Sequence, residues 1–403
     1  MSIDRSQPAN DADAGYRWLL AMCRRWLVER TGQEAEAVPV APLRAGGWAA
    51  VQELGHFHSV EPILFSLFAR AALDDAAVPA QARARWEKAY YSNRIRNIEA
   101  LTVLASLLDR CNDARVEVLA LKGPAAMADV YRDVALRPMA DLDILCRTRD
   151  LVSVTRMART LGFCEGSPYL HHVTLQYGAP GGGFLELHFD MHRVMANKAR
   201  FMESAWREQT TTAAEDWVLP VMSLEHQIVF DVAHCANHGF DIGLKHVVDF
   251  AGRLMLHRTD LNRDRLGALL DETGLSNEFS ALVLTIEELL RLPLAVSLGS
   301  LTSRVPEEMF EREFLQRSVT FGLVARRVAA SGVRRQPSII GKSAYAWRRL
   351  FPPLVAAQAA FGSRSRLHAL AYLPVHAGRT LIDVASRRRK EAASPGPPKH
   401  PDS

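Results

Sequence analysis

Apolar positions follow a helical spacing in two long parts of the chain and a strand-like spacing in the part between them. Residues 15–115 and 193–386 place apolar side chains at every third or fourth position, with Pro and Gly at the breaks. Residues 116–192 instead carry short β-branched and leucine-rich runs, some of alternating polarity. This pattern predicts an α/β core between two mostly helical regions.

The central part is predicted to contain a strand, a helix, a second strand, a second helix and a hairpin. The run VEVLAL forms the first strand, and KGP leads into a helix with Pro124 in its first turn, where a missing N–H costs little. ADLDILC forms the second strand, and Gly162 ends the helix after it. HHVTLQYG and FLELHFDMH flank the turn APGGG, which is typical of a β-hairpin. We therefore expect a small mixed sheet.

The chain is expected to divide into five segments. Its first and last segments are polar, and the last is rich in Pro, so both are expected to be disordered. The segments are residues 1–14 (disordered), 15–115 (helical), 116–192 (α/β core), 193–386 (helical) and 387–403 (disordered tail).

Composition narrows the class of protein only slightly. With 48% hydrophobic residues and a net charge of +4 over 403 residues, the chain is typical of a soluble, mostly helical protein, and its charge does not indicate nucleic acid as a partner. The basic residues beyond Ala325 are more typical of a solvated face than of a binding patch. Scattered cysteines favour a reducing compartment, the N-terminus does not resemble a signal peptide, and no apolar run is long enough to span a bilayer. We therefore expect a cytoplasmic protein without a membrane span.

Two acids, Asp141 and Asp143, interrupt the otherwise apolar strand DLDIL. Residues i and i+2 of a strand point to the same face, so the two carboxylates lie together while Leu142 and Ile144 face the other side. Burying such a pair is costly unless a cation compensates the charge. Hard cations such as Mg²⁺ or Mn²⁺ take carboxylate oxygens and keep positions open for substrate phosphates. The strand thus predicts a divalent cation site.

The hairpin supplies a third acid. In FLELHFD, alternation places Glu186 and His188 on one face and the apolar residues on the other. If this strand lies beside DLDIL, Glu186 joins Asp141 and Asp143 in a cradle for two metal ions. His188 is expected to form hydrogen bonds within the site, with a role as base or metal-supporting residue as the alternative.

The turn before the first helix is suited to phosphate. Gly123 lets the backbone approach a ligand, and the following helix offers free N–H groups. Lys122 or Arg137 could neutralise a triphosphate, and Arg137 is better suited to bidentate contact. Pairing of either cation with the acids is the alternative. Together with the acids, the turn indicates phosphate chemistry.

These motifs carry a resemblance to a known family. LKGPAAMADVYRDVALRPMADLDILC, followed by LGF and LELHF, resembles the uncharacterised nucleotidyltransferase family within the DNA polymerase β superfamily. The helices LEHQIVFDVAHCANHGF and LKHVVDFAGRL resemble its downstream part, so the likeness covers about residues 45–260. Where the wider superfamily has Gly-Ser in its turn, this chain has Gly123 followed by Pro124, so the serine contact to phosphate is missing.

The resemblance implies an α/β (α+β) nucleotidyltransferase core and transfer of a nucleoside monophosphate from an NTP, taken to be ATP, with Mg²⁺ or Mn²⁺. Asp141 and Asp143 become the metal-binding pair, Glu186 the third catalytic acid and Gly123 part of the phosphate turn. The acceptor is a hydroxyl on a sugar, a small metabolite, a peptide or RNA. Two alternatives stay open: a catalytically inactive nucleotide-binding or scaffold protein of the same fold, and a toxin-like enzyme that modifies tRNA or a protein.

Two further pairs of residues are assigned a smaller role. His234 and His238 lie four residues apart on a predicted helix and could hold zinc, but no third ligand is evident nearby, so zinc is not predicted there. Lys245 and Asp249, also four apart, are predicted to pair along one helix face.

Overall fold

The structure is a computed structural model that describes most of the chain up to Thr302 and a short part beyond it. The predicted tail 387–403, residues 1–10 of the first segment and residues 303–352 of the predicted C-terminal helical region lie outside the described residues. The described residues are 11–32, 43–70, 78–164, 166–178, 183–238, 240, 242–302, 353–362, 370, 373–374 and 377.

Helices predominate in the described parts of both flanking regions and cover the sheet. The helices are α1 (Asp11–Arg30), α2 (Ala45–Phe57), α3 (Glu61–Ala69), α4 (Ala80–Asp113), α5 (Lys122–Ala126), the π-helix η1 (Met127–Tyr131), α6 (Leu151–Thr160), α7 (Lys198–Arg207), α8 (Leu224–Asn237), α9 (Leu244–Leu256), α10 (Arg263–Thr273), α11 (Ser276–Leu290), α12 (Leu294–Leu298), the 3-10 helix η2 (Gly299–Thr302) and α16 (Leu354–Phe361). Since α1 begins at Asp11, residues 11–14 are helical rather than disordered as predicted.

The sheet is mixed, as predicted. Its strands are β1 (Val118–Ala120), β2 (Asp141–Cys146), β3 (Ser167–Pro168), β4 (His172–Gln176), β5 (Phe184–His188), β6 (Thr210–Ala214) and β7 (Trp217–Val221). They lie in the order β3-β4-β5-β2-β1-β7-β6. β2 pairs antiparallel with β1 and parallel with β5, while β4 and β5 form the predicted antiparallel hairpin.

The hairpin of β6 and β7 was not predicted. It lies within the segment assigned to helices, yet β7 pairs parallel with β1 and extends the sheet beyond the predicted core. Its strands TTTAA and WVLPV are too short to give a clear periodic pattern between helices. The boundary of the sheet therefore lies near Val221 rather than near His192.

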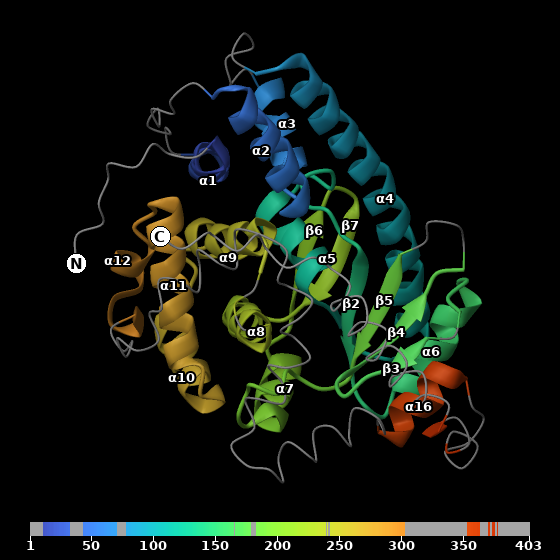
Figure 1. The fold of residues 1–403 in the computed structure, drawn as a ribbon. Helices are drawn as coiled ribbons and strands as arrows, with labels where there is room; N and C mark the ends of the chain where they lie inside the picture. The colour runs from blue at the N-terminus through green and yellow to red at the C-terminus, as the bar shows by residue number, and fades with distance from the viewer. Residues whose placement is uncertain are drawn as a thin grey trace, which may run out of the picture.

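The two faces of the sheet pack against different helices (Figure 1). Leu142, Ile144, Leu185 and Leu187 share a buried cluster with apolar residues of α4, α6 and α16. The opposite face, with Leu145, belongs to a second cluster that contains residues of α1, α8, α9 and α11. The N-terminal and C-terminal helices thus share one core on the face that also carries the acids of β2.

Among the described residues, no helix combines the length and the apolar character that crossing a bilayer requires.

Candidate functional site

The acids predicted from the sequence lie on adjacent strands. Asp143 pairs with Glu186 across the parallel strands β2 and β5, and Asp141 precedes Asp143 by two residues on the same face. The side chain of Asp143 is 2% exposed and that of Glu186 is 20% exposed, so the group can be reached from solvent at its Glu186 end. The strand register predicted from alternation therefore brings two carboxylates together.

Lys122 lies between these two carboxylates. Its Nζ is 2.7 Å from Oδ1 of Asp143 and 3.5 Å from Oε2 of Glu186. The residue has a φ of +40°, a left-handed conformation that costs a side-chain-bearing residue about 1 kcal/mol. Such backbone strain gathers at functional sites, where surrounding contacts hold it in place. Here the strained turn directs an ammonium group to the position where a cation would neutralise the acids.

The pKa of Asp141 is raised, whereas the pKa values of Asp143 and Glu186 are lowered. Burial raises the pKa of Asp141, and the charges on Asp143 and Glu186 raise it further. Burial would also raise the pKa of Asp143 and Glu186, but Lys122 and contacts with His188 outweigh it, so the pKa of Asp143 is lowered and that of Glu186 falls to about 2. Asp143 and Glu186 therefore carry negative charge at neutral pH.

His188 contacts the carboxylates of Asp143 and Glu186. Its ring is buried, with Nε2 2.9 Å from Oδ1 of Asp143 and 3.5 Å from Oε2 of Glu186. Because a carboxylate only accepts, Nε2 carries the hydrogen in this contact. The predicted hydrogen bonding of His188 within the site matches this geometry.

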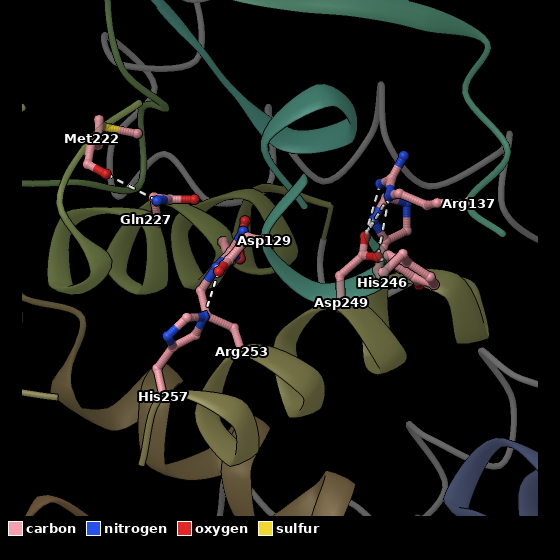
Figure 2. A network of polar contacts seen from close by, with 10 residues as sticks. Asp129, Arg137, Met222, Gln227, His246, Asp249, Arg253 and His257 are labelled. Atoms are coloured by element: carbon pink, nitrogen blue, oxygen red, sulfur yellow. Dashed lines mark hydrogen bonds and ion pairs between the residues drawn. The ribbon is translucent and has the colours of Figure 1, made fainter. Parts of the chain in front are cut away.

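Arg137 forms its ion pair with Asp249 and not with the acids of β2 and β5. Its guanidinium donates from Nε and Nη2 to both carboxylate oxygens of Asp249, at 2.7–3.1 Å, and is 4% exposed (Figure 2). Tyr131 donates its hydroxyl to the same carboxylate. The predicted nucleotide contact of Arg137 differs from this arrangement, because two nitrogens of its guanidinium already bind the carboxylate of Asp249. The predicted pairing of Asp249 with Lys245 is likewise replaced by the pair with Arg137.

Gly123 packs directly on this ion pair. A Cβ at Gly123 would lie 3.0 Å from Nη1 of Arg137 and 3.2 Å from two side-chain atoms of Met139. A Cβ there would require these side chains to shift by a few tenths of an ångström. The glycine of the predicted phosphate turn is therefore also favoured by packing.

Asp249 lies on α9, and a second buried ion pair involves Arg253 of the same helix. Arg253 donates to Asp129 of η1 at 2.8 Å, and His257 binds the other oxygen of Asp129 (Figure 2). Burial would raise the pKa of Asp129, but the hydrogen bond from His257 and the charge on Arg253 lower it to about 2. Asp249, Arg253 and His257 follow at intervals of four residues and so project from one side of α9. These pairs hold α9 against the turn that carries Lys122.

Lys245 is a residue of the site that sequence reasoning missed. It lies in the first turn of α9, its charge interacts with Asp141 and Asp143, and burial lowers its pKa. It forms no ion pair with the described residues. No local pattern in the sequence indicates this role, because the position of Lys245 depends on how α9 packs against the rest of the chain.

The residues present fit a hard divalent cation. Donor atoms of Asp143, Glu186 and His188 lie within 4.8 Å of one another, and two of these donors are carboxylate oxygens. Asp141 makes no hydrogen bond or ion pair with the described residues, so its carboxylate is available as a further ligand. The donor atoms that lie this close belong to Asp143, Glu186 and His188, so the structure brings two of the three predicted acids together and leaves Asp141 on the same face of β2 but outside the group. Asp143 and Glu186 could thus hold Mg²⁺ once Lys122 withdraws.

Comparison with known proteins points to one family. A family model described as "Uncharacterised nucleotidyltransferase" matches residues 44–291. Comparison with curated proteins found no match.

Two solved structures are similar over part of the chain. The antibiotic-resistance factor ANT(2'')-Ia shares 14% identity, with a TM-score of 0.34 over 43% of this chain and 90% of its own. An antigenic nucleotidyltransferase-like protein from Paracoccidioides brasiliensis shares 14% identity, with a TM-score of 0.32 over 52% of this chain and 95% of its own.

Proposed function

This protein belongs to the uncharacterised nucleotidyltransferase family, whose model matches more than half of the chain, and we propose that it transfers a nucleoside monophosphate from an NTP to a hydroxyl-bearing acceptor. The single observation that carries the proposal is the pairing of Asp143 with Glu186 on neighbouring strands, with Asp141 on the same face. Enzymes that transfer phosphoryl groups use such carboxylates to bind the metal ions that neutralise the phosphate charge.

The chain's own residues supply the binding and the charge. Asp143 and Glu186 are ionised, since their pKa values are lowered, and Asp141 on the same face of β2 would add an oxygen ligand if it moved toward the ion. Mg²⁺ or Mn²⁺ bound there, in one or two positions, would neutralise the triphosphate and activate the acceptor hydroxyl. His188 holds Asp143 in place through its Nε2 hydrogen.

Lys245 is the cation that we assign to the phosphates. Lys122 is engaged by Asp143 and Arg137 by Asp249, whereas Lys245 forms no ion pair with described residues while its charge interacts with the acids. An ammonium near a triphosphate forms charge-assisted hydrogen bonds. The backbone at Gly123 offers the second contact, in keeping with the predicted phosphate turn.

A second candidate is a protein of the same fold that binds a nucleotide but does not catalyse its transfer. The observation that favours it is the ammonium of Lys122 in the position of a cation, 2.7 Å from Asp143. In such a protein Lys122 would take the place of the metal permanently, and the nucleotide would bind without transfer. For the enzyme, Lys122 must withdraw when the divalent cation enters.

Pyrophosphate release tests the proposal. Each NTP, beginning with ATP, would be incubated with the full chain, Mg²⁺ and a panel of sugars, small metabolites, peptides and RNA. Transfer predicts pyrophosphate release in the presence of one acceptor class, and Asp143→Asn should abolish it.

The matched control is Asp260→Asn, because the side chain of Asp260 is 72% exposed and lies outside the acid group. This variant should retain full activity. Nucleotide binding without pyrophosphate release under all conditions would instead support the non-catalytic protein.

A further inference from the structure

Histidine rings gather beside the acids, in a cluster of which the proposed transfer uses only His188. His171 and His172 lie at the start of β4, and His188 lies at the end of β5. Their ring centroids are 4.6 Å (His171 to His172), 5.1 Å (His172 to His188) and 5.7 Å (His171 to His188) apart. His192 extends the cluster, 5.2 Å from His171.

The backbone of this cluster is fixed. The carbonyl of His171 accepts hydrogen bonds from the amides of Phe189 and Asp190, and the carbonyl of His172 accepts one from Tyr169. The two strands that carry the rings pair residue for residue, with His172 opposite His188. The sheet register therefore brings His172 and His188 together, and backbone hydrogen bonds hold His171 immediately before β4.

Buried ring nitrogens in the cluster lack partners. Nδ1 of His172 and of His188, and both nitrogens of His192, have no hydrogen-bond partner within the described part of the chain. The side chain of His188 is only 1% exposed, so its ring is shielded from bulk solvent. A buried nitrogen with an unused lone pair costs free energy, and a bound ion would remove that cost.

The other nitrogen of two rings faces a carboxylate. Nε2 of His188 lies 2.9 Å from Asp143, and Nε2 of His172 lies 3.6 Å from Glu186. Metal-binding histidines commonly donate one ring N–H to a carboxylate while the second nitrogen binds the ion. His172 and His188 have this arrangement, with Nδ1 as the nitrogen left for a ligand bond.

We infer that His171, His172 and His188 form a binding site for a transition-metal ion of the zinc class, which lies beside the carboxylate site and shares His188 with it. One ring nitrogen from each residue lies within 4.8 Å of the other two. Nitrogens bound tetrahedrally to zinc are about 3.4 Å apart, so the ring nitrogens must approach one another by up to about 1.4 Å. His171 and His172 are partly exposed, which gives them room to do so. Three histidines leave the fourth zinc position open to water or substrate.

The chemistry of the donors separates the two sites. Imidazole nitrogen suits zinc and related transition metals, whereas the oxygens of Asp141, Asp143 and Glu186 suit magnesium. The inferred zinc site does not depend on nucleotidyl transfer, because metal binding can be measured without any NTP. A negative result in the transferase assay would therefore not contradict the zinc site.

Zinc binding in excess magnesium tests the site. Metal-free full-length protein would be titrated with Zn²⁺ in millimolar Mg²⁺ by calorimetry, and the zinc retained after gel filtration would be counted. We expect one tightly bound Zn²⁺ per chain. Single His171→Ala and His172→Ala changes should weaken binding by at least about tenfold, since even supporting residues contribute that much.

Two control variants locate the ion. His56→Ala should bind zinc like the wild type, because the His56 side chain is 73% exposed and remote from the cluster. Asp141→Asn should also retain zinc, since it alters only the carboxylate site. Absence of zinc binding, displacement of zinc by Mg²⁺, or loss of zinc from Asp141→Asn with retention in His172→Ala would overturn the inference.

X-ray absorption on the zinc-loaded wild type decides the matter if the histidine variants do not fold. The spectrum should show scattering from three imidazole rings around the ion. A shell made mainly of carboxylate or water oxygens would contradict the assignment.

Discussion

Removal of the Lys122 ammonium should make the protein's stability depend on a divalent cation. In Lys122→Met the apolar stem is retained, but Asp143 and Glu186 lose their cationic partner. Removing one member of a buried ion pair costs about 3–5 kcal/mol. Since the side chains of Lys122 and Glu186 are 14% and 20% exposed, water screens part of this, and we expect about 3 kcal/mol.

Magnesium should restore most of that loss. An ion present at a hundredfold excess over its Kd adds about 2.7 kcal/mol to the folded state. In the wild type the same ion must first displace Lys122, so magnesium should add clearly less. The measurement is urea unfolding of both proteins with Mg²⁺ and with chelator, followed by circular dichroism.

The control is Lys198→Met. Lys198 pairs with Asp190 at a partly exposed position, where the side chains are 28% and 36% exposed, so its loss should cost less than about 1 kcal/mol and should not respond to magnesium. If Lys122→Met were as stable as the wild type in chelator, or if magnesium stabilised both proteins equally, Lys122 would not occupy a cation position.

Three further predictions concern the residues around this site. Lys245→Met should weaken NTP binding by about tenfold or more, the value of a charge-assisted hydrogen bond, with the free energy of unfolding unchanged; a fluorescence titration with nucleotide checks this. Arg137→Met should lower the free energy of unfolding by about 3 kcal/mol or more because it leaves Asp249 buried and unpaired, and adding Asp249→Leu should recover at least about 1 kcal/mol in a double-mutant cycle. The pKa of Asp129 lies at about 2 in the folded state, below its ordinary 3.8, so its stabilisation is complete above 3.8 and is lost as the pH falls towards 2. The difference in unfolding free energy between wild type and Asp129→Asn should therefore shrink by about 1 kcal/mol from pH 6 to pH 3.

Local patterns were sufficient to predict the centre of the fold. Alternation in DLDIL and FLELH predicted which residues share a face, and the register of β2 and β5 places Asp143 opposite Glu186 as expected. The turn chemistry of APGGG predicted the hairpin of β4 and β5. These features depend on residues close in sequence, which is why they could be predicted.

Contacts between distant parts of the chain could not be predicted in the same way. Arg137 and Asp249 are 112 residues apart, and Asp129 and Arg253 are 124 apart, so no local spacing indicates either pair. The helical segment that follows KGP ends at Tyr131, where Arg132 adopts a left-handed φ of +59° that no residue type in the sequence indicates. The position of Lys245 depends on the docking of α9, which these two distant ion pairs produce.

Parallel reactions with ATP labelled at the α- or the γ-phosphate, in the presence of Mg²⁺ and the acceptor that supports pyrophosphate release, test the central claim most directly. The account predicts that label from the α-phosphate becomes attached to the acceptor while label from the γ-phosphate leaves as pyrophosphate, and that Asp143→Asn abolishes both. Attachment of the γ-phosphate, or equal transfer by Asp143→Asn, would contradict it.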